Sequence, residues 1–274
     1  MSIQHPALNK YKIAIVSRTY EGELYFNALR FLHGLEIPFF AYTGWDAQGY
    51  LREICLMDYD FVINIDEDAY VYDVKAMLDL LVYMAENGYH FCGMPDGGVV
   101  GTRVENPLVQ NAYFNIFDLR KIRPVIPGIR SIEKQTFDES WIEQFPMEML
   151  RCSYNWQGKD LYYPFSFWLL KEGFKPLYLS AFEWEEDSIT SILRNHEEKP
   201  FLMHTWFSRA YIKNEEPHVA RINYALKEAE KYTNGLVLKN TQIPSYSIIK
   251  RPIKLRLKKF FRKVEEDIKK RIRL

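Results

Sequence analysis

Cysteine is scarce in this sequence, and its placement excludes two kinds of site. Only Cys55, Cys92 and Cys152 occur among the 274 residues. They are far apart and odd in number, so they provide neither the paired framework of a disulfide-rich domain nor the spacing of a zinc site. We therefore expect reduced core thiols and a cytoplasmic protein.

Long apolar runs are missing as well. No stretch reaches the roughly 18 apolar residues that a membrane-spanning helix needs. The first six residues, Met-Ser-Ile-Gln-His-Pro, do not have the pattern of a signal peptide. Internal repeats and low-complexity segments are also absent. The sequence thus predicts a globular chain that does not cross a membrane.

Glycine-rich nucleotide motifs are absent after the first predicted strand, at 12–16. The polar segment that follows, Ser17 to Gly22, contains neither the dinucleotide fingerprint GxGxxG nor a P-loop. This absence argues against NAD, FAD and P-loop nucleotide binding.

Charge is unevenly distributed along the chain, although the formal net charge is zero. Residues 250–274 contain 12 Lys or Arg and three acidic residues, which leaves 24 basic and 33 acidic residues in the remainder. The chain therefore consists of a mildly acidic body and a strongly basic tail.

Strand and helix patterns alternate through the first 65 residues. This βαβαβ order predicts an α/β fold with a mostly parallel central sheet, helices on its faces and a ligand crevice at the carboxyl ends of its strands. The region 124–158 has no clear pattern. The predicted strands are 12–16, 37–42, 61–65, 89–93, 111–119, 176–179 and 201–206, and the predicted helices are 23–35, 46–57, 72–87, 161–170 and 215–232.

An acidic triplet, Asp66-Glu67-Asp68, directly follows the apolar strand at 61–65. Carboxylates two residues apart at a strand end can turn to one side, and such oxygen ligands suit Mg²⁺ or Mn²⁺ shared with a diphosphate. The alternative is a loop that caps the next helix, where acidic residues are common. The triplet alone leaves both interpretations open, and the rest of the chain has to decide between them.

From this point the chain resembles the glycosyltransferases of the GT-A fold, including those that build bacterial surface glycans. Asp66-Glu67-Asp68 is similar to their DxD motif, and three later segments follow the order of that family. Asn115 lies in a strand similar to the one that presents an asparagine to the donor sugar. Asp160 precedes an aromatic helix, and His204 lies in a late strand. The resemblance covers about residues 10–212.

The resemblance implies a metal-dependent hexosyltransferase that uses a nucleotide-diphosphate sugar, with a UDP-sugar expected, and Mn²⁺ or Mg²⁺. It implies that Asp66, Asp68 and His204 bind the metal ion and that Glu67 points away from it. For Asp66, contact with the nucleoside or binding of the ion through a water molecule is the alternative. Asp160 would be the general base of an inverting enzyme, with the acid cluster containing Glu183 and Asp187 as its rival. Stereochemistry stays open. The residues assigned to the nucleotide sugar are Ser17, Arg18, Asp66, Asp68 and Asn115.

Two other functions remain open at this level. A nucleotidyltransferase can use a similar sheet and metal carboxylates, but it normally has a glycine-rich basic loop after its first strand. A non-catalytic nucleotide-sugar-binding module associated with the membrane would be favoured if Asp66, Asp68 and His204 lay too far apart to share one cation.

The basic tail has apolar residues at helical spacing, among them Phe260, Phe261 and Val264. An amphipathic basic helix is typical of binding to an anionic membrane surface, here the inner face of the cell membrane. Docking on a protein and binding of nucleic acid are the alternatives, and we expect no nucleic acid. A lipid-linked or glycan acceptor fits such a location. The predicted division is a catalytic domain at 1–232, with a nucleotide-binding half at 10–70 and an acceptor half at 89–212, a linker at 233–249 and the tail helix at 250–274.

Overall fold

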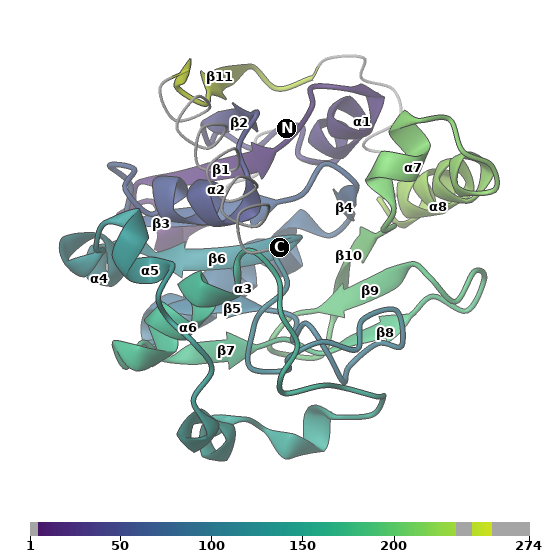
Figure 1. The fold of residues 1–274 in the computed structure, drawn as a ribbon. Coiled ribbons are helices and arrows are strands. Elements are labelled where there is room, and N and C mark those ends of the chain that lie inside the picture. The colour runs from purple at the N-terminus through teal and green to yellow at the C-terminus, as the bar shows by residue number, and fades with distance from the viewer. Residues whose placement is uncertain (1–4, 234–242, 254–274) are drawn as a thin grey trace, which may run out of the picture.

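The protein has an α/β fold built on a seven-stranded, mostly parallel sheet, as the computed structural model shows (Figure 1). The structure describes residues 5–233 and 243–253. The strands are ordered β11-β2-β1-β3-β6-β5-β7, and only β6 runs antiparallel to its neighbours. Their bounds are β1 Ile13–Arg18, β2 Phe39–Thr43, β3 Phe61–Ile65, β5 Phe91–Gly93, β6 Phe114–Asp118, β7 Pro176–Tyr178 and β11 Tyr246–Lys250.

The predicted βαβαβ unit is confirmed. Strands β1, β2 and β3 pair in parallel and are connected by α1 (Glu23–Phe31) and α2 (Ala47–Ile54). Asp46 caps α2, as predicted, by accepting a hydrogen bond from the Gly49 N–H. Helix α1 ends four residues earlier than the apolar pattern predicts, in a turn where Gly34 adopts a φ of +89°. Such a conformation favours glycine.

Helices cover both faces of the sheet because its buried strands alternate apolar residues between two cores. Ile13 and Ile15 of β1 pack with α1 and α3 (Val74–Asn87), whereas Ala14 and Val16 pack on the opposite face. The opposite face carries α2, α4 (Leu119–Ile122), α5 (Ile129–Ile132) and the aromatic helix α6 (Tyr163–Lys171). The predicted irregular region at 124–158 contains α5 and short 3-10 turns, η2 Arg123–Val125, η3 Glu139–Gln144 and η4 Met147–Met149, and the remaining such turn, η1 Pro6–Leu8, precedes β1.

A second, antiparallel sheet of four strands lies beside the carboxyl end of β3. Its order is β4-β10-β9-β8, with bounds β4 Ala69–Val71, β8 Ala181–Glu183, β9 Ser191–Arg194 and β10 Pro200–His204. One face of this sheet joins the core under α3. Its other face packs on α1 and on α8 (His218–Tyr232), which follows the short helix α7 (Ser208–Ile212).

The linker predicted at 233–249 is wrong for residues 246–249, which form most of β11. This strand pairs in parallel with β2 at the sheet edge, and Tyr246 packs edge-on against Tyr25 at 5.4 Å. The Trp45 indole N–H donates to the Ile249 carbonyl, and Arg251 forms a 2.7 Å ion pair with Asp46. A five-residue edge strand whose partner lies about 200 residues earlier leaves little pattern in the sequence.

The predicted start of the tail helix at residue 250 is also wrong, because Lys250 is the last residue of β11. Residues 234–242 of the predicted linker and residues 254–274 of the predicted tail helix lie outside the described residues. Among the described residues, the structure contains no helix that is both long enough and apolar enough to cross a membrane.

Candidate functional site

The acidic triplet forms the turn that leads from the main sheet into the second sheet. Strand β3 ends at Ile65 and β4 begins at Ala69, so the triplet fills the connection between them. The Asp66 N–H donates to the Tyr113 carbonyl at 2.8 Å, and the Ala69 N–H donates to the Asp66 carbonyl at 3.2 Å. These backbone hydrogen bonds fix both carboxylates at the sheet edge, where ligands bind in α/β folds.

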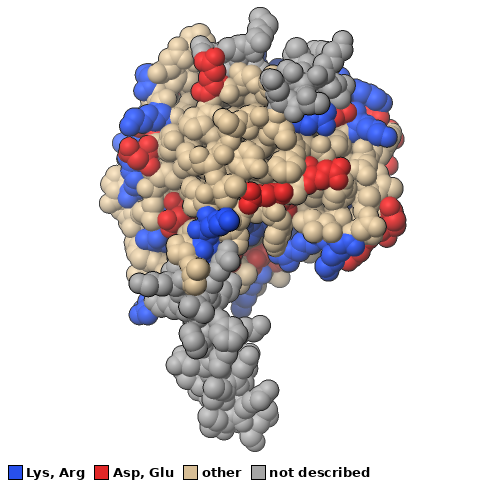
Figure 2. Space-filling view, turned by 90° about the horizontal axis from the view of Figure 1, so that it is seen from above, with Lys and Arg blue, Asp and Glu red and all other residues tan. Residues whose placement is uncertain are grey.

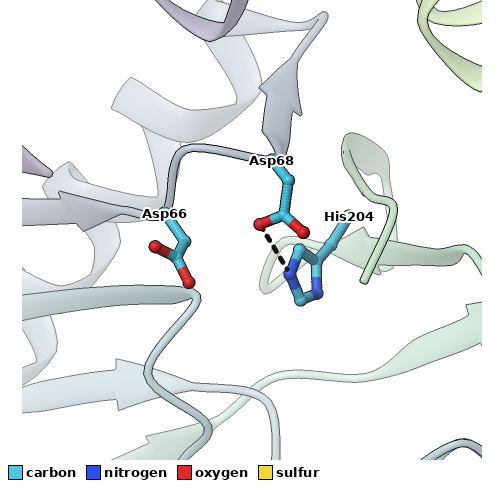
Figure 3. A group of neighbouring side chains, drawn as sticks. All are labelled: Asp66, Asp68 and His204. Atoms are coloured by element: carbon cyan, nitrogen blue, oxygen red, sulfur yellow. Dashed lines mark ion pairs between the residues drawn. The ribbon is translucent and has the colours of Figure 1, made fainter. Parts of the chain in front are cut away.

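His204 reaches the triplet from the end of β10, 136 residues after Asp68. Register pairs His204 with Ala69, and the Thr205 N–H and hydroxyl both donate to the Asp68 carbonyl, at 3.1 and 3.2 Å. The His204 Nε2 atom consequently lies 3.3 Å from Asp68 Oδ1 (Figure 3). The fold therefore places His204 beside Asp68, as the sequence predicts.

The three side chains fit a metal ion. One ligand atom from each of Asp66, Asp68 and His204 lies within 4.8 Å of the other two. Asp68 and His204 are buried, and neither Asp68 Oδ1 nor His204 Nδ1 has a hydrogen-bond partner. A buried carboxylate oxygen that accepts no hydrogen bond is costly, even with the His204 Nε2 atom 3.3 Å away. A divalent cation would satisfy it, and carboxylate and imidazole ligands together suit Mn²⁺.

The electrostatics of the turn reflect crowded carboxylates. Loss of hydration, and then the neighbouring Asp68, raise the pKa of Asp66 from 3.8 to about 6, although Arg18 and His204 oppose the rise. Burial, and then Asp66, raise the pKa of Glu67 to about 7. Like charges held this closely without a counterion are unfavourable, and a bound cation would relieve that repulsion.

Glu67 points away from the ligand group, as expected. Its Oε2 atom accepts hydrogen bonds from the Thr19 hydroxyl at 2.8 Å and from the Tyr20 N–H at 3.0 Å. Glu67 thereby joins the triplet to the loop after β1.

Ser17 and Arg18 occupy the carboxyl end of β1, beside β3. Arg18 lies close enough to Asp66 to lower the pKa of its carboxyl group, and Ser17 is buried. The structure thus brings Arg18 into the electrostatic environment of the acidic turn.

Asn115 lies in a buried amide network. Its Oδ1 atom accepts from Asn64 at 3.1 Å, and its Nδ2 group donates to the carbonyls of Cys92 and Asn111, at 3.3 and 3.1 Å. The Asn64 Oδ1 atom in turn accepts from the Tyr50 hydroxyl at 2.6 Å. The Asn115 amide is thus engaged within the protein, where it ties β6 to Asn64 of β3 through its oxygen and to Cys92 of β5 through its N–H.

The three acids considered for a general base lie in different surroundings. Asp160 precedes α6, accepts a hydrogen bond from the Leu161 N–H at 2.6 Å and lies 3.8 Å from Arg103. Asp187 accepts hydrogen bonds from Ile189, Thr190 and Arg221, which close its turn onto α8. Glu183 ends β8 and accepts a 2.7 Å hydrogen bond from the Gly101 N–H.

Two aromatic side chains support His204, and their role was not predicted from the sequence. The Tyr113 ring stacks on the imidazole at 4.1 Å, and the Trp206 ring lies 4.2 Å from it. Trp206 and Phe207 both have left-handed backbone conformations, with φ of +57° and +62°. That conformation costs about 1–3 kcal/mol for bulky residues. It turns the chain sharply after β10, and the only sequence signal for it is the position of Trp206 two residues after His204.

No family model matches the sequence, and no curated protein matches it. Among solved structures, the chain is similar to a mannosyltransferase from Pyrobaculum calidifontis in complex with GDP-Man and Mn²⁺, at 10% identity and a TM-score of 0.34, over 54% of this chain and 56% of that one. It is also similar to the glycosyltransferase GlyE of Streptococcus pneumoniae TIGR4, at 14% identity and a TM-score of 0.38, over 87% of this chain and 66% of that one. The chain thus spans less than two thirds of either neighbour, and likenesses this distant do not define its activity.

Proposed function

We propose that this protein is a metal-dependent glycosyltransferase that moves a hexose from a nucleotide-diphosphate sugar to a glycan or lipid-linked acceptor. The observation that carries the proposal is the convergence of Asp66, Asp68 and His204, whose ligand atoms lie within 4.8 Å of one another. The order of these residues in the chain resembles that of GT-A enzymes, and their position at the carboxyl edge of a parallel sheet fits nucleotide binding.

The residues of the site have distinct roles in this proposal. Asp66, Asp68 and His204 would hold Mn²⁺ or Mg²⁺, and the bound ion supplies Lewis-acid stabilisation of the departing diphosphate. Arg18 adds a positive charge on the Asp66 side, where it attracts the same diphosphate. Ser17 and the loop at Thr19 and Tyr20, which Glu67 holds in place, border the nucleotide.

The geometry bears on the two alternatives. A binding module without catalytic function would be favoured by ligands too far apart to share a cation, but Asp66, Asp68 and His204 form one compact group. A nucleotidyltransferase would need a basic glycine-rich loop after β1. The segment from Ser17 to Gly22 contains one basic residue, Arg18, and one glycine, Gly22. Thr19 and Tyr20 in its middle donate hydrogen bonds to the carboxylate of Glu67. The glycosyltransferase is the better match.

The basic tail supports a location at the inner face of the cell membrane. On the face shown in Figure 2, the described Lys, Arg, Asp and Glu side chains are interspersed, and much of the surface between them is uncharged. Positive charge is concentrated instead in the 12 basic residues of 250–274. About 1 kcal/mol for each basic residue near an anionic surface is ample for reversible binding.

Thermal-shift measurements with UDP- and GDP-hexoses, with and without Mn²⁺, test the proposed function. We expect one nucleotide sugar to raise the melting temperature of the wild-type protein by several degrees only when Mn²⁺ is present. Asp66→Ala should keep the wild-type circular dichroism spectrum and lose both this shift and metal-dependent sugar transfer. Full transfer activity in Asp66→Ala would refute the proposal.

A further inference from the structure

Four residues form a row across the second sheet, and the metal-ligand candidate His204 is one of them. Register pairs Ala69 with His204, His204 with Ser191, and Ser191 with Glu183. Directly paired residues on antiparallel strands point to the same face of a sheet. The carboxylate of Glu183 therefore shares a face with the imidazole of His204, and two strand spacings separate their Cα atoms by about 10 Å.

Trp206 contacts the two middle residues of this row, His204 and Ser191. Its indole N–H donates to the Ser191 hydroxyl at 2.9 Å, and its ring lies 4.2 Å from the ring of His204. The Arg221 guanidinium also donates to the Trp206 carbonyl, at 3.1 Å. The indole is thus held beside His204 and Ser191, the two middle residues of the row, while Arg221 holds the backbone of Trp206. A partly exposed aromatic ring of this kind offers a flat apolar surface on which a sugar ring can stack.

Glu183 is held in place by a close backbone contact. Its Oε1 atom accepts a 2.7 Å hydrogen bond from the Gly101 N–H, and a Cβ atom at position 101 would lie only 2.9 Å from that oxygen. Glycine at this position permits the contact. One carboxylate oxygen is thereby anchored, and the carboxylate keeps further acceptor capacity on Oε2.

The side chains of the other two candidate acids, Asp187 and Asp160, are engaged in contacts within the protein. Asp187 is surrounded by the donors of its own turn and by Arg221. Asp160 accepts the Leu161 N–H and faces Arg103, which forms a two-bond pair with the fully buried Asp96. Although burial alone would raise it, hydrogen bonds from Thr190, Ile189 and Arg221 hold the pKa of Asp187 below its ordinary value, which makes that carboxylate a weaker base. Neither acid lies in the row of His204.

We propose that Glu183 is the general base of the transfer reaction and that the transferred sugar lies over Trp206, between the metal site and Glu183. This inference rests on the proposed function. In the step, a Glu183 carboxylate oxygen takes the proton of the acceptor hydroxyl, and the hydroxyl oxygen bonds to the anomeric carbon. The bond from that carbon to the diphosphate oxygen breaks, and its electron pair leaves with the nucleoside diphosphate. Attack from the side opposite the leaving group inverts the anomeric centre.

Glu183→Gln tests this assignment, because the amide keeps an oxygen for the Gly101 N–H and removes the basic group. The assay measures Mn²⁺-dependent release of nucleoside diphosphate from a panel of UDP- and GDP-hexoses, with water as the acceptor. Calorimetry measures nucleotide-sugar affinity in parallel. We expect turnover to fall about 10²–10⁴-fold, while the affinity changes less than about twofold and the melting temperature is unchanged.

Glu185→Gln is the matched control, since Glu185 lies two residues further along in the same turn and is exposed. It should keep wild-type turnover. Wild-type turnover in Glu183→Gln, or a large loss in Asp160→Asn with no loss in Glu183→Gln, would overturn the assignment and leave the proposed function intact. If the wild-type protein binds none of the nucleotide sugars with Mn²⁺, the proposed function fails, and the role of Glu183 fails with it.

Discussion

Backbone hydrogen bonds hold Asp68 and His204 in place while their side-chain atoms stay available. Thr205 donates twice to the Asp68 carbonyl, and strand pairing fixes His204 opposite Ala69. The Tyr113 ring then fixes the plane of the imidazole by stacking at 4.1 Å. Asp68 Oδ1 and His204 Nδ1 remain without hydrogen-bond partners in a buried setting. Such preorganisation is what a metal site requires of its surroundings.

Cation binding should weaken as the pH falls, because Asp66 must be ionised to act as a ligand. Its pKa in the folded protein is about 6, above the ordinary value of 3.8, chiefly because of lost hydration and then because of Asp68. Without metal, the folded state therefore binds this proton more tightly than the unfolded state does. Ionised Asp66 lowers the stability of the metal-free protein as the pH rises from about 4 to about 6.

Calorimetric titration with Mn²⁺ at pH 7.5 and pH 5.5 measures this effect. About a quarter of Asp66 is ionised at the lower pH, so we expect the affinity to fall at least about fourfold. The melting temperature of the metal-free protein is recorded at the same two pH values. The contribution of Asp66 to that melting temperature should be more favourable at pH 5.5 than at pH 7.5. An Mn²⁺ affinity that is equal at both values would exclude Asp66 as a ligand.

At the scale of elements, β11 connects the basic tail to the body. The strand pairs with β2, and Arg251, just beyond it, forms an ion pair with Asp46 at the start of α2. Strand β11 is parallel to β2 and β1. The chain therefore leaves β11 at the same end of the sheet as the carboxyl ends of β1 and β2. The metal-ligand candidates follow β3 at that same edge. A membrane-bound tail would therefore hold this edge near the surface that carries a lipid-linked acceptor.

Removing residues 254–274 tests the role of the tail without disturbing β11. We expect the shortened chain to keep the melting temperature of the full chain, because β11 and the pair between Arg251 and Asp46 remain. It should no longer co-sediment with vesicles containing an anionic phospholipid, whereas the full chain should do so at low salt and less at high salt. Vesicles of phosphatidylcholine alone are the control. Unchanged co-sedimentation of the shortened chain would contradict a membrane role for the tail.

At the scale of the whole molecule, the candidate site lies where two sheets of different kind meet. The acidic turn carries the chain from the parallel sheet into the antiparallel one, and β10 brings His204 back to the same place (Figures 1 and 3). The parallel sheet supplies an edge with converging strand ends, and the antiparallel sheet supplies a row of side chains that leads away from it. In the proposed reaction, the departing diphosphate is bound at the edge of the parallel sheet, and the acceptor hydroxyl loses its proton to Glu183 on the antiparallel sheet.

The sequence predicts those features of the site that neighbouring residues determine. It does not predict those that depend on contacts between residues far apart in the chain. Asp66 and Asp68 follow an apolar strand directly, so local pattern places them at the sheet edge. Local pattern also places Asn115 in a strand, but its amide is engaged by Asn64, 51 residues earlier, and by two carbonyl groups. The position of Glu183 depends on the register of three antiparallel strands, which no local pattern encodes. The pairing of β11 with β2 likewise depends on residues about 200 positions apart, and no local pattern encodes it.

Titration calorimetry of Mn²⁺ in the presence of UDP, comparing the wild type with Asp68→Asn, tests the central claim most directly. Asp58→Asn is the matched control, since the Asp58 side chain is 85% exposed and only forms surface ion pairs. We expect one Mn²⁺ per chain in the wild type and in the control, and at least about 100-fold weaker binding in Asp68→Asn, because one ligand of the ion is lost. Equal Mn²⁺ binding by Asp68→Asn and the wild type would contradict a metal site at Asp66, Asp68 and His204.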